Sequence, residues 1–269
     1  MGEDVGGWRS SCCGLGRSAW CAGVGVAGGD LDVAAVRGAP MESDRGPLAA
    51  LGEESRALSD VLRQVDPEDF GRSTNCPPWN LDELVVHIAM SIHLGDDDEV
   101  PAASPLSGVM TAADYYRRPE RDTSAYRQSN VERTTDAAGD VLASTTAARW
   151  FDEVSRDTVL RLSRLDLGRL VQIPSCGPMK LADWVTTRVM SVAAHGLDVA
   201  LTLGLEPWTT RTALDVTCPV LIALLGTEPP AQLDWDDRTL LAAGTGRRAL
   251  TPAERAVLGP LQSRFPLLS

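Results

Sequence analysis

Apolar residues recur along most of this chain at steps of three and four, the period of helices that bury one face. A first such helix is predicted from Pro47 to the Asp66-Pro67 pair, because a residue that precedes proline is disfavoured in the helical region. A second begins after Asn80, which has the capping-box spacing to Glu83. No run alternates strongly enough for a central strand, so the pattern predicts an all-α fold.

The second half of the chain continues the helical pattern. The stretch TAADYYRRPERDTSAYRQSN predicts a short helix and a loop, and a long amphipathic helix is predicted over about residues 137–165. The segment VQIPSCGPM is short and irregular, and it leads into a helix over Trp184–Leu203. A further apolar helix over residues 209–225 contains Pro219, which is expected to kink or split it.

These segments divide the chain into three parts. Residues 1–40 have no usable period and many glycines, so we expect a disordered extension that cannot offset its ordering entropy. Four main helices then predict an antiparallel four-helix bundle over residues 41–205. Residues 206–269 are expected to form a mainly helical tail packed on the bundle, with a last helix starting at Thr251-Pro252.

The helix over Trp184–Leu203 carries a row of polar side chains along the edge of its apolar face. Arg188, Ser191, His195 and Asp198 follow one another at steps of three and four, so all four look into the same space. Each one buried without a partner would cost roughly 1–3 kcal/mol. His87, on the border of the second helix's apolar face, is the other histidine in such a setting. The two histidines either share a metal or are hydrogen-bonded core residues.

Charge and composition exclude several classes of function. The net charge of -12 disfavours binding to a phosphate backbone, which needs clustered lysine and arginine. The six cysteines show no metal-like spacing and no disulfide framework, which favours the reducing cytoplasm. No apolar run approaches the roughly 20 residues that span a bilayer, and the N-terminus lacks the features of a signal peptide. We therefore expect a cytoplasmic protein with neither nucleic-acid nor membrane partners.

Two motifs then point to a known family. The segment CPPWNLDELVVHIA resembles the CPGW and DLVAHLA signature of the maleylpyruvate isomerase N-terminal domain group. This group is the mycothiol-dependent branch of the DinB/YfiT-like superfamily, found largely in actinobacteria. RVMSVAAHGLDVA resembles the group's R-x-x-E-x-x-x-H-G-x-D-x-A helix, and the tail resembles "TGR" tails of related sequences. The resemblance covers about residues 45–265 and implies a DinB-like antiparallel four-helix bundle.

The resemblance also implies a site. In the family a divalent metal, usually zinc, is bound by one His on the second helix and by a Glu and a His on the last bundle helix. The two His positions match His87 and His195, whereas the Glu position holds Ser191, whose neutral hydroxyl is a poor zinc ligand. Arg188 either pairs with Asp198 or Asp183 or holds an anionic group of a thiol or substrate.

The function implied is a metal-dependent, mycothiol-dependent S-transferase or isomerase. It would act on an electrophilic small molecule, in natural-product or detoxification metabolism, as a monomer or homodimer. The bound metal lowers the pKa of the thiol, so that a thiolate nucleophile exists at neutral pH. One alternative is a small-molecule-binding or regulatory protein with a degenerate metal site. Another is a metal-free enzyme that uses the same cavity, with His195 as acid or base.

Overall fold

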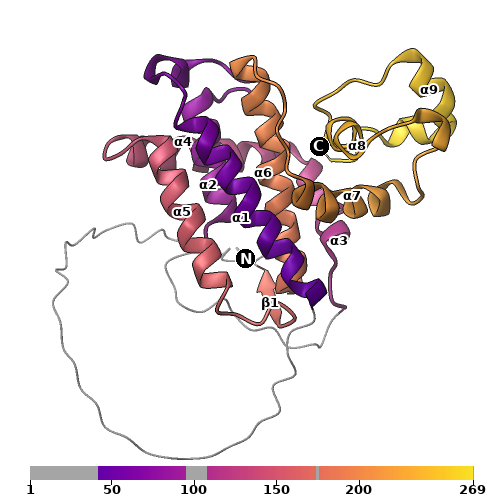
Figure 1. The fold of residues 1–269 in the computed structure, drawn as a ribbon, viewed down its shortest axis with the longest axis horizontal. Helices are drawn as coiled ribbons and strands as arrows, with labels where there is room; N and C mark the ends of the chain where they lie inside the picture. The colour runs from indigo at the N-terminus through magenta and orange to yellow at the C-terminus, as the bar shows by residue number, and fades with distance from the viewer. Residues whose placement is uncertain (1–41, 95–107, 174–175, 269) are drawn as a thin grey trace, which may run out of the picture. The chain divides into compact units, whose positions relative to one another are not determined.

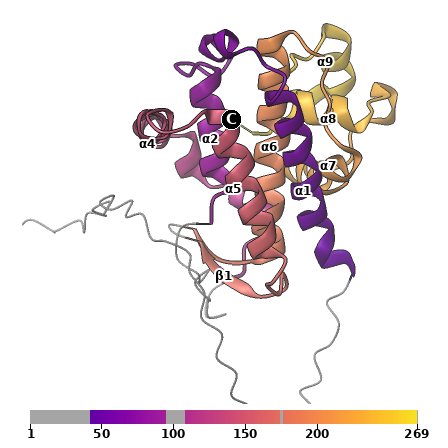
Figure 2. The same cartoon turned by 60° about the vertical axis from the view of Figure 1, so that its left-hand side comes forward.

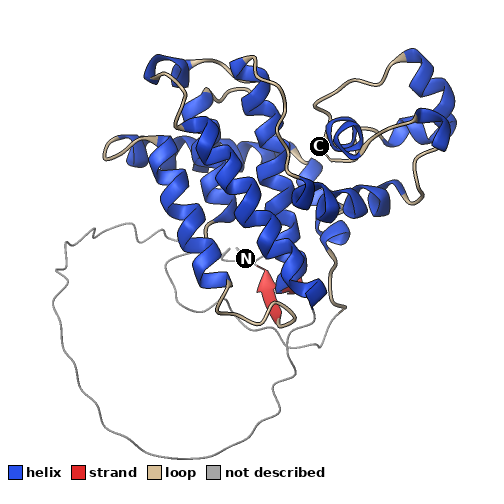
Figure 3. Ribbon diagram, in the orientation of Figure 1, coloured by secondary structure: helices blue, strands red, loops and turns tan. Residues whose placement is uncertain are grey.

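The computed structural model describes residues 42–94, 108–173 and 176–268. The expected disordered extension over residues 1–40 and the acidic loop after the second helix lie outside these ranges. Figure 3 shows that the described residues are mostly helical, with one small pair of strands. The prediction of an all-α fold is confirmed. None of the described helices is long and apolar enough to cross a membrane.

Four helices form the bundle: α1 (Glu42–Leu62), α2 (Leu81–Ile92), α5 (Ala147–Leu162) and α6 (Leu181–Leu203). Helix α1 packs against α5 and α6, and α2 packs against the same two helices (Figures 1 and 2). Their apolar faces meet in a core of fully buried side chains that includes Leu51, Leu84, Phe151 and Val189. The core follows from the three- and four-residue spacing of these apolar positions.

The helix ends follow local sequence signals. Asn80 accepts a hydrogen bond from the Glu83 backbone while the Glu83 carboxylate accepts one from the Asn80 backbone, which confirms the predicted capping box. Thr251 and Glu254 make the same arrangement at the start of α9 (Pro252–Leu258). Helix α6 ends at Gly204, whose φ of 67° is a left-handed conformation that glycine adopts without strain. The first helix starts at Glu42, before the Pro47 at which the sequence places its start.

The prediction of a single helix over residues 137–165 is wrong. Helix α4 (Ser124–Leu142) begins well before that range, after α3 (Ala112–Tyr116) and the 3-10 turn η2 (Pro119–Asp122). The chain then breaks and restarts as α5. Thr146 causes the restart, because its side chain accepts a hydrogen bond from the Arg149 backbone and caps the new helix. A Thr hydroxyl favours such a cap over a helix interior.

The segment expected to be irregular contains an antiparallel pair of strands. Strand β1 (Leu170–Ile173) pairs with β2 (Gly177–Lys180), with Val171 opposite Met179. Both of these side chains are fully buried. The sequence does not reveal these strands, because each has only four residues, too few to show a clear alternation of apolar and polar positions. The last residue of β2, Lys180, is the N-cap of α6, so the hairpin fixes where α6 begins.

The C-terminal part consists of α7 (Arg211–Leu225), α8 (Asp237–Gly244) and α9, with 3-10 turns at Ala231–Leu233 and Gly259–Arg264. Helix α7 packs on α1 and α6 and runs through Pro219 without being split. Glu54 of α1 accepts hydrogen bonds from both the backbone nitrogen of Thr210, at 2.8 Å, and its hydroxyl, at 2.7 Å. This contact anchors the first turn of α7 to the bundle.

Candidate functional site

Helices α2 and α6 bring His87 and His195 together inside the bundle. The two imidazole centroids lie 5.2 Å apart with the rings perpendicular. One helical turn away, the hydroxyls of Ser91 and Ser191 are 2.9 Å apart. From the histidine pair to the serine pair, the residue number rises along α2 and falls along α6, as antiparallel helices require. The structure therefore places three of the predicted site residues at one point of the α2–α6 contact, and their role as metal ligands stays a prediction.

The surroundings of His87 fix its ring and keep it neutral. Its Nδ1 atom is 3.1 Å from the hydroxyl of Thr134 on α4, and its ring stacks on Trp79 at a centroid distance of 4.4 Å. Burial, together with the nearby imidazole of His195, lowers the pKa of His87 to about 3. A neutral imidazole whose Nδ1 is already engaged offers Nε2 to a ligand.

Asp198 orients the second imidazole. The Nδ1 atom of His195 lies 2.8 Å from Oδ2 of this fully buried carboxylate. Burial by itself raises the pKa of Asp198, but hydrogen bonds from His195 and Arg247 outweigh it and hold the pKa well below its ordinary value. An ionised carboxylate only accepts hydrogen bonds, so Nδ1 of His195 carries the proton and Nε2 keeps its lone pair.

The same carboxylate has three more partners, which the sequence did not reveal. Arg247, from the loop between α8 and α9, donates to Oδ1 from Nε at 3.0 Å and to Oδ2 from Nη2 at 2.7 Å. Asn75 donates to Oδ1 at 2.9 Å, and the thiol of Cys76 donates to Oδ2 at 3.2 Å. The C-terminal part therefore completes the site within the bundle. Cys76 lies in the CPPW motif and Arg247 in the TGR motif, the signals that could have pointed to them.

A second group of side chains could hold a metal ion: the ligand atoms of Cys76, His195 and Asp198 lie within 4.8 Å of one another. One observation speaks against a metal at this point. Arg247 already binds both carboxylate oxygens, so a cation would have to displace another cation. In the metal-free protein, burial and the adjacent carboxylate raise the pKa of the Cys76 thiol to about 12, so the thiol keeps its proton and donates a hydrogen bond to Asp198. We assign Asp198 to orienting His195.

Ser191 and Arg188 are both engaged with α2. Ser191 donates to the hydroxyl of Ser91, which in turn donates to the carbonyl of Ile88 at 2.7 Å. Arg188 donates to the Ser91 carbonyl at 2.7 Å and to the Thr187 hydroxyl at 3.0 Å. These bonds satisfy the polar row that the sequence predicted on α6.

Of the two alternatives for Arg188, a pairing with Asp198 or Asp183 is not what the structure shows. Asp198 pairs with Arg247, and Asp183 accepts a hydrogen bond from the Ala112 backbone at 3.0 Å. The reason is that groups from α3 and from the C-terminal loop already bond to these two carboxylates. The Arg188 guanidinium instead lies over the ring of Tyr115, 5.4 Å from its centroid. Its charge is stabilised by neutral groups, so it can still meet an anion.

A comparison with protein families decides the relationship. Residues 51–200, more than half of the chain, match the family described as the mycothiol maleylpyruvate isomerase N-terminal domain. The chain belongs to this family. Its DinB-like fold is thereby confirmed together with the predicted resemblance. Neither a comparison with curated proteins nor one with solved structures finds a match.

The two histidines fit the metal that the family resemblance implies. Two imidazoles bound through Nε2 to one tetrahedral zinc, each about 2.0–2.1 Å away, have centroids roughly 5 Å apart. His87 and His195 have this spacing, at 5.2 Å, and their Nδ1 atoms are held by Thr134 and Asp198. A partner on the other ring nitrogen is usual for histidine ligands of metals. The position that the family resemblance gives to a third ligand holds Ser191, whose hydroxyl donates to Ser91.

Proposed function

We propose that this protein is a thiol-dependent S-transferase or isomerase. It binds a low-molecular-weight thiol, mycothiol as in the family's description, between His87 and His195 and delivers it to an electrophilic small molecule. The observation that supports this most is the convergence of two neutral imidazoles, 5.2 Å apart, each oriented through Nδ1. We place the reaction in the cytoplasm, in natural-product or detoxification metabolism, with a monomer or homodimer as the working unit.

His87 and His195 would hold a divalent metal, and zinc suits two imidazoles. When bound, such a cation lowers the pKa of a thiol at the site, so that thiolate forms at neutral pH. Because Ser191 brings no charge where the family has a carboxylate, the thiolate is itself the anionic donor expected there. The metal, its identity and the thiol are all part of this proposal.

The other residues of the site position and orient. Asp198 holds His195 in the tautomer that keeps Nε2 unprotonated. Arg188 is fixed by two hydrogen bonds, to the Ser91 carbonyl and the Thr187 hydroxyl, and carries a positive charge. We assign it to an anionic group of the thiol or of the electrophile, which would orient that molecule against the histidines.

Enzyme assays with mycothiol and a chromogenic aryl halide test this proposal. Zinc-loaded protein should form the thioether faster than the same mixture without protein, and the rate should fall to background in His87→Ala. His93→Ala is the matched control, since His93 is exposed at the end of α2 and its replacement should leave the rate unchanged. No acceleration, or one that survives His87→Ala, would contradict the proposal.

The 2.8 Å contact between His195 and Asp198 favours one second candidate. In it the protein is a metal-free enzyme, and His195, oriented by Asp198, acts as acid or base on the substrate. Chelator treatment separates the two candidates. Activity that persists without metal and is lost in His195→Gln supports the second. Activity that returns only with added zinc supports the first, and a protein without either activity would be a binding or regulatory member of the family.

A further inference from the structure

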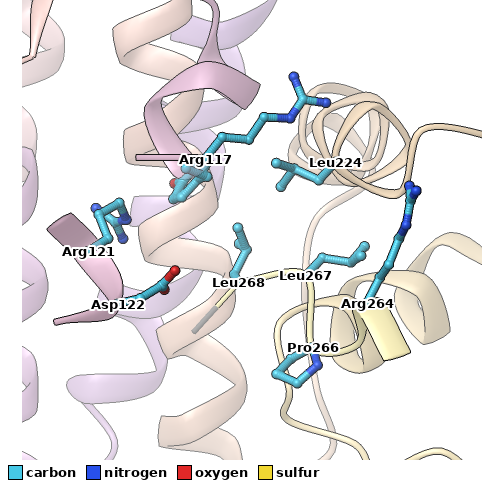
Figure 4. A pocket seen from close by; sticks show the side chains of 9 residues that line it. Arg117, Arg121, Asp122, Leu224, Arg264, Pro266, Leu267 and Leu268 are labelled. Atoms are coloured by element: carbon cyan, nitrogen blue, oxygen red, sulfur yellow. The ribbon is translucent and has the colours of Figure 1, made fainter. Parts of the chain in front are cut away.

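A cavity of about 330 Å³ opens among α3, the η2 turn, the end of α7 and the C-terminal segment after α9 (Figure 4). Its volume is at the lower end of the range of roughly 300–1,000 Å³ for small-molecule sites. Neither His87 nor His195 lines it, so the proposed thiol chemistry does not account for it. The residues that line it come from segments far apart in the chain, and their charges define what it can bind.

The walls of the cavity are basic. Arg117, Arg121 and Arg264 line it, against the single carboxylate of Asp122. Arg117 donates to the carbonyl of Ala223 at 2.5 Å, and Arg264 donates to the carbonyl of Leu225. Both carbonyls belong to the last turn of α7, where partial negative charge accumulates. Arg117 also pairs with the carboxylate of Asp114 at 3.3 Å, which offsets part of its charge, whereas the acceptor of Arg264 is a neutral carbonyl.

Arg121 is stabilised differently from the other two arginines. Its guanidinium lies over the rings of Tyr115 and Tyr116, 5.0 Å from each centroid, and over that of Tyr126 at 5.5 Å. It also donates a hydrogen bond to the Tyr126 hydroxyl at 3.2 Å. Aromatic faces attract a cation but do not neutralise it. Arg121 therefore keeps its positive charge, and Figure 4 shows it on the opposite side of the cavity from Leu224.

Three leucines give the cavity an apolar wall across from Arg121. Leu224 comes from α7, and Leu267 and Leu268 come from the C-terminal segment. From this arrangement we propose that the cavity binds a small amphiphilic anion, a carboxylate attached to an apolar chain, with the carboxylate at Arg121 and the chain against Leu224 and Leu268. The site is distinct from the histidine pair. Its test needs neither metal nor thiol, so it can fail without affecting the proposed function.

Calorimetric titration of the full chain with octanoate tests the proposal directly. Octanoate should bind once per chain. Octanol, which lacks the charge, and acetate, which lacks the chain, should each bind at least about tenfold more weakly, because charged and apolar contacts each contribute to affinity. Undetectable octanoate binding, or equal binding of octanol, would overturn the proposal.

Two variants locate the ligand in this cavity. Arg121→Gln should weaken octanoate binding by about tenfold or more, since it removes the charged partner. Leu224→Trp should also abolish binding, because the larger side chain fills the cavity while leaving all three arginines in place. Arg149→Gln is the control, an exposed arginine on α5 whose loss should change nothing. Binding that is unaffected in either cavity variant would overturn the proposal.

The ionisation of Tyr115 provides a second readout. Burial raises the pKa of this phenol, but Arg188, Arg121 and Arg118 outweigh burial and lower the pKa to about 8. A carboxylate bound at Arg121 adds negative charge next to the phenolate, so octanoate should raise that pKa. Tyrosinate absorbance, followed against pH with and without octanoate, measures the shift, and Tyr115→Phe identifies the step. Octanoate binding that leaves the Tyr115 step unmoved would place the ligand elsewhere and overturn the proposal.

Discussion

Ser191 on α6 donates a hydrogen bond to Ser91 on α2 across 2.9 Å, one helical turn from the His87–His195 pair. The family resemblance implies a glutamate ligand at the position of Ser191. Here a short hydroxyl pair occupies the contact between the two helices, and both hydroxyls are satisfied, since Ser91 donates onward to Ile88. The proposed metal site therefore has two imidazoles but no carboxylate at the position that the resemblance assigns to a third ligand.

Restoring that charge should strengthen metal binding. Ser191→Glu places a carboxylate one turn before His195 and next to His87, so we expect zinc affinity to rise by about tenfold or more. Competition against a chelating indicator measures the affinity. Ser191→Gln, similar in size but neutral, is the control and should not produce the gain.

The opposite result has a clear meaning. In a metal-free pocket, the new Glu carboxylate would be buried without a partner, its pKa would rise, and the protein would lose a few kcal/mol of stability without gaining zinc affinity. Arg188, one turn away, could neutralise the carboxylate and hide the loss of stability. Zinc affinity therefore decides between the two outcomes, whatever the melting temperature does.

Asp198 is expected to be the most costly polar residue to remove. Asp198→Ala leaves the guanidinium of Arg247 partly buried without its carboxylate, and should lower the free energy of unfolding by about 3–5 kcal/mol. Chemical denaturation measures this. In the double variant Asp198→Ala/Arg247→Met the unpaired charge is gone, so the combined loss should be smaller than the sum of the two single losses. Additive losses would show that the pair is not coupled.

Much of the fold could be predicted because its signals are local. The capping box at Asn80, the Thr251 cap and the stop at Gly204 each depend on a few neighbouring residues. The same locality explains the error over residues 137–165. There the three- and four-residue spacing of apolar positions continues across a break between two helices. The cap at Thr146 sets this break, and apolar spacing alone does not reveal a cap.

From the residues alone, the site was predictable mainly on one helix, and the family resemblance added His87 on a second. The row of polar side chains from Arg188 to Asp198 indicated that these side chains need hydrogen-bond partners. Helical geometry placed Ser191 and His195 on one face. The partners themselves come from elsewhere in the chain, with Arg247 in the C-terminal loop and Cys76 before α2. The CPPW and TGR motifs mark these residues but do not say what they bond to, because the contacts depend on how distant parts of the chain pack together.

The low pKa of Tyr115 makes stability depend on pH in a defined direction. The folded pKa is about 8 and the ordinary value is 10, so the folded state releases the phenol proton first. The resulting stabilisation is fully present above pH 10 and is lost as pH falls through 8. Unfolding of wild type and Tyr115→Phe should thus differ more at pH 10 than at pH 7, by at most roughly 2–3 kcal/mol. A difference that is the same at both pH values would contradict the arginine cluster around this ring.

Glu54 should hold the C-terminal part on the bundle. Glu54→Ala removes the carboxylate oxygen that accepts both hydrogen bonds from Thr210, so we expect a loss of roughly 1–3 kcal/mol and faster hydrogen exchange of the first amides of α7. Glu53→Ala is a matched control, because Glu53 is only partly buried and accepts a single bond, from Thr212 at 2.6 Å. Equal effects of the two variants would show that Glu54 is not the specific anchor.

Zinc content of protein purified without chelator, compared across histidine variants, tests the central claim most directly. A metal shared by His87 and His195 predicts close to one zinc per chain in wild type and in His93→Ala, and none in His87→Ala or His195→Ala. Circular dichroism confirms that each variant is folded. Wild-type protein that contains no zinc and takes up none when it is supplied, or a His87→Ala variant that keeps the full complement, would contradict the two-histidine metal site.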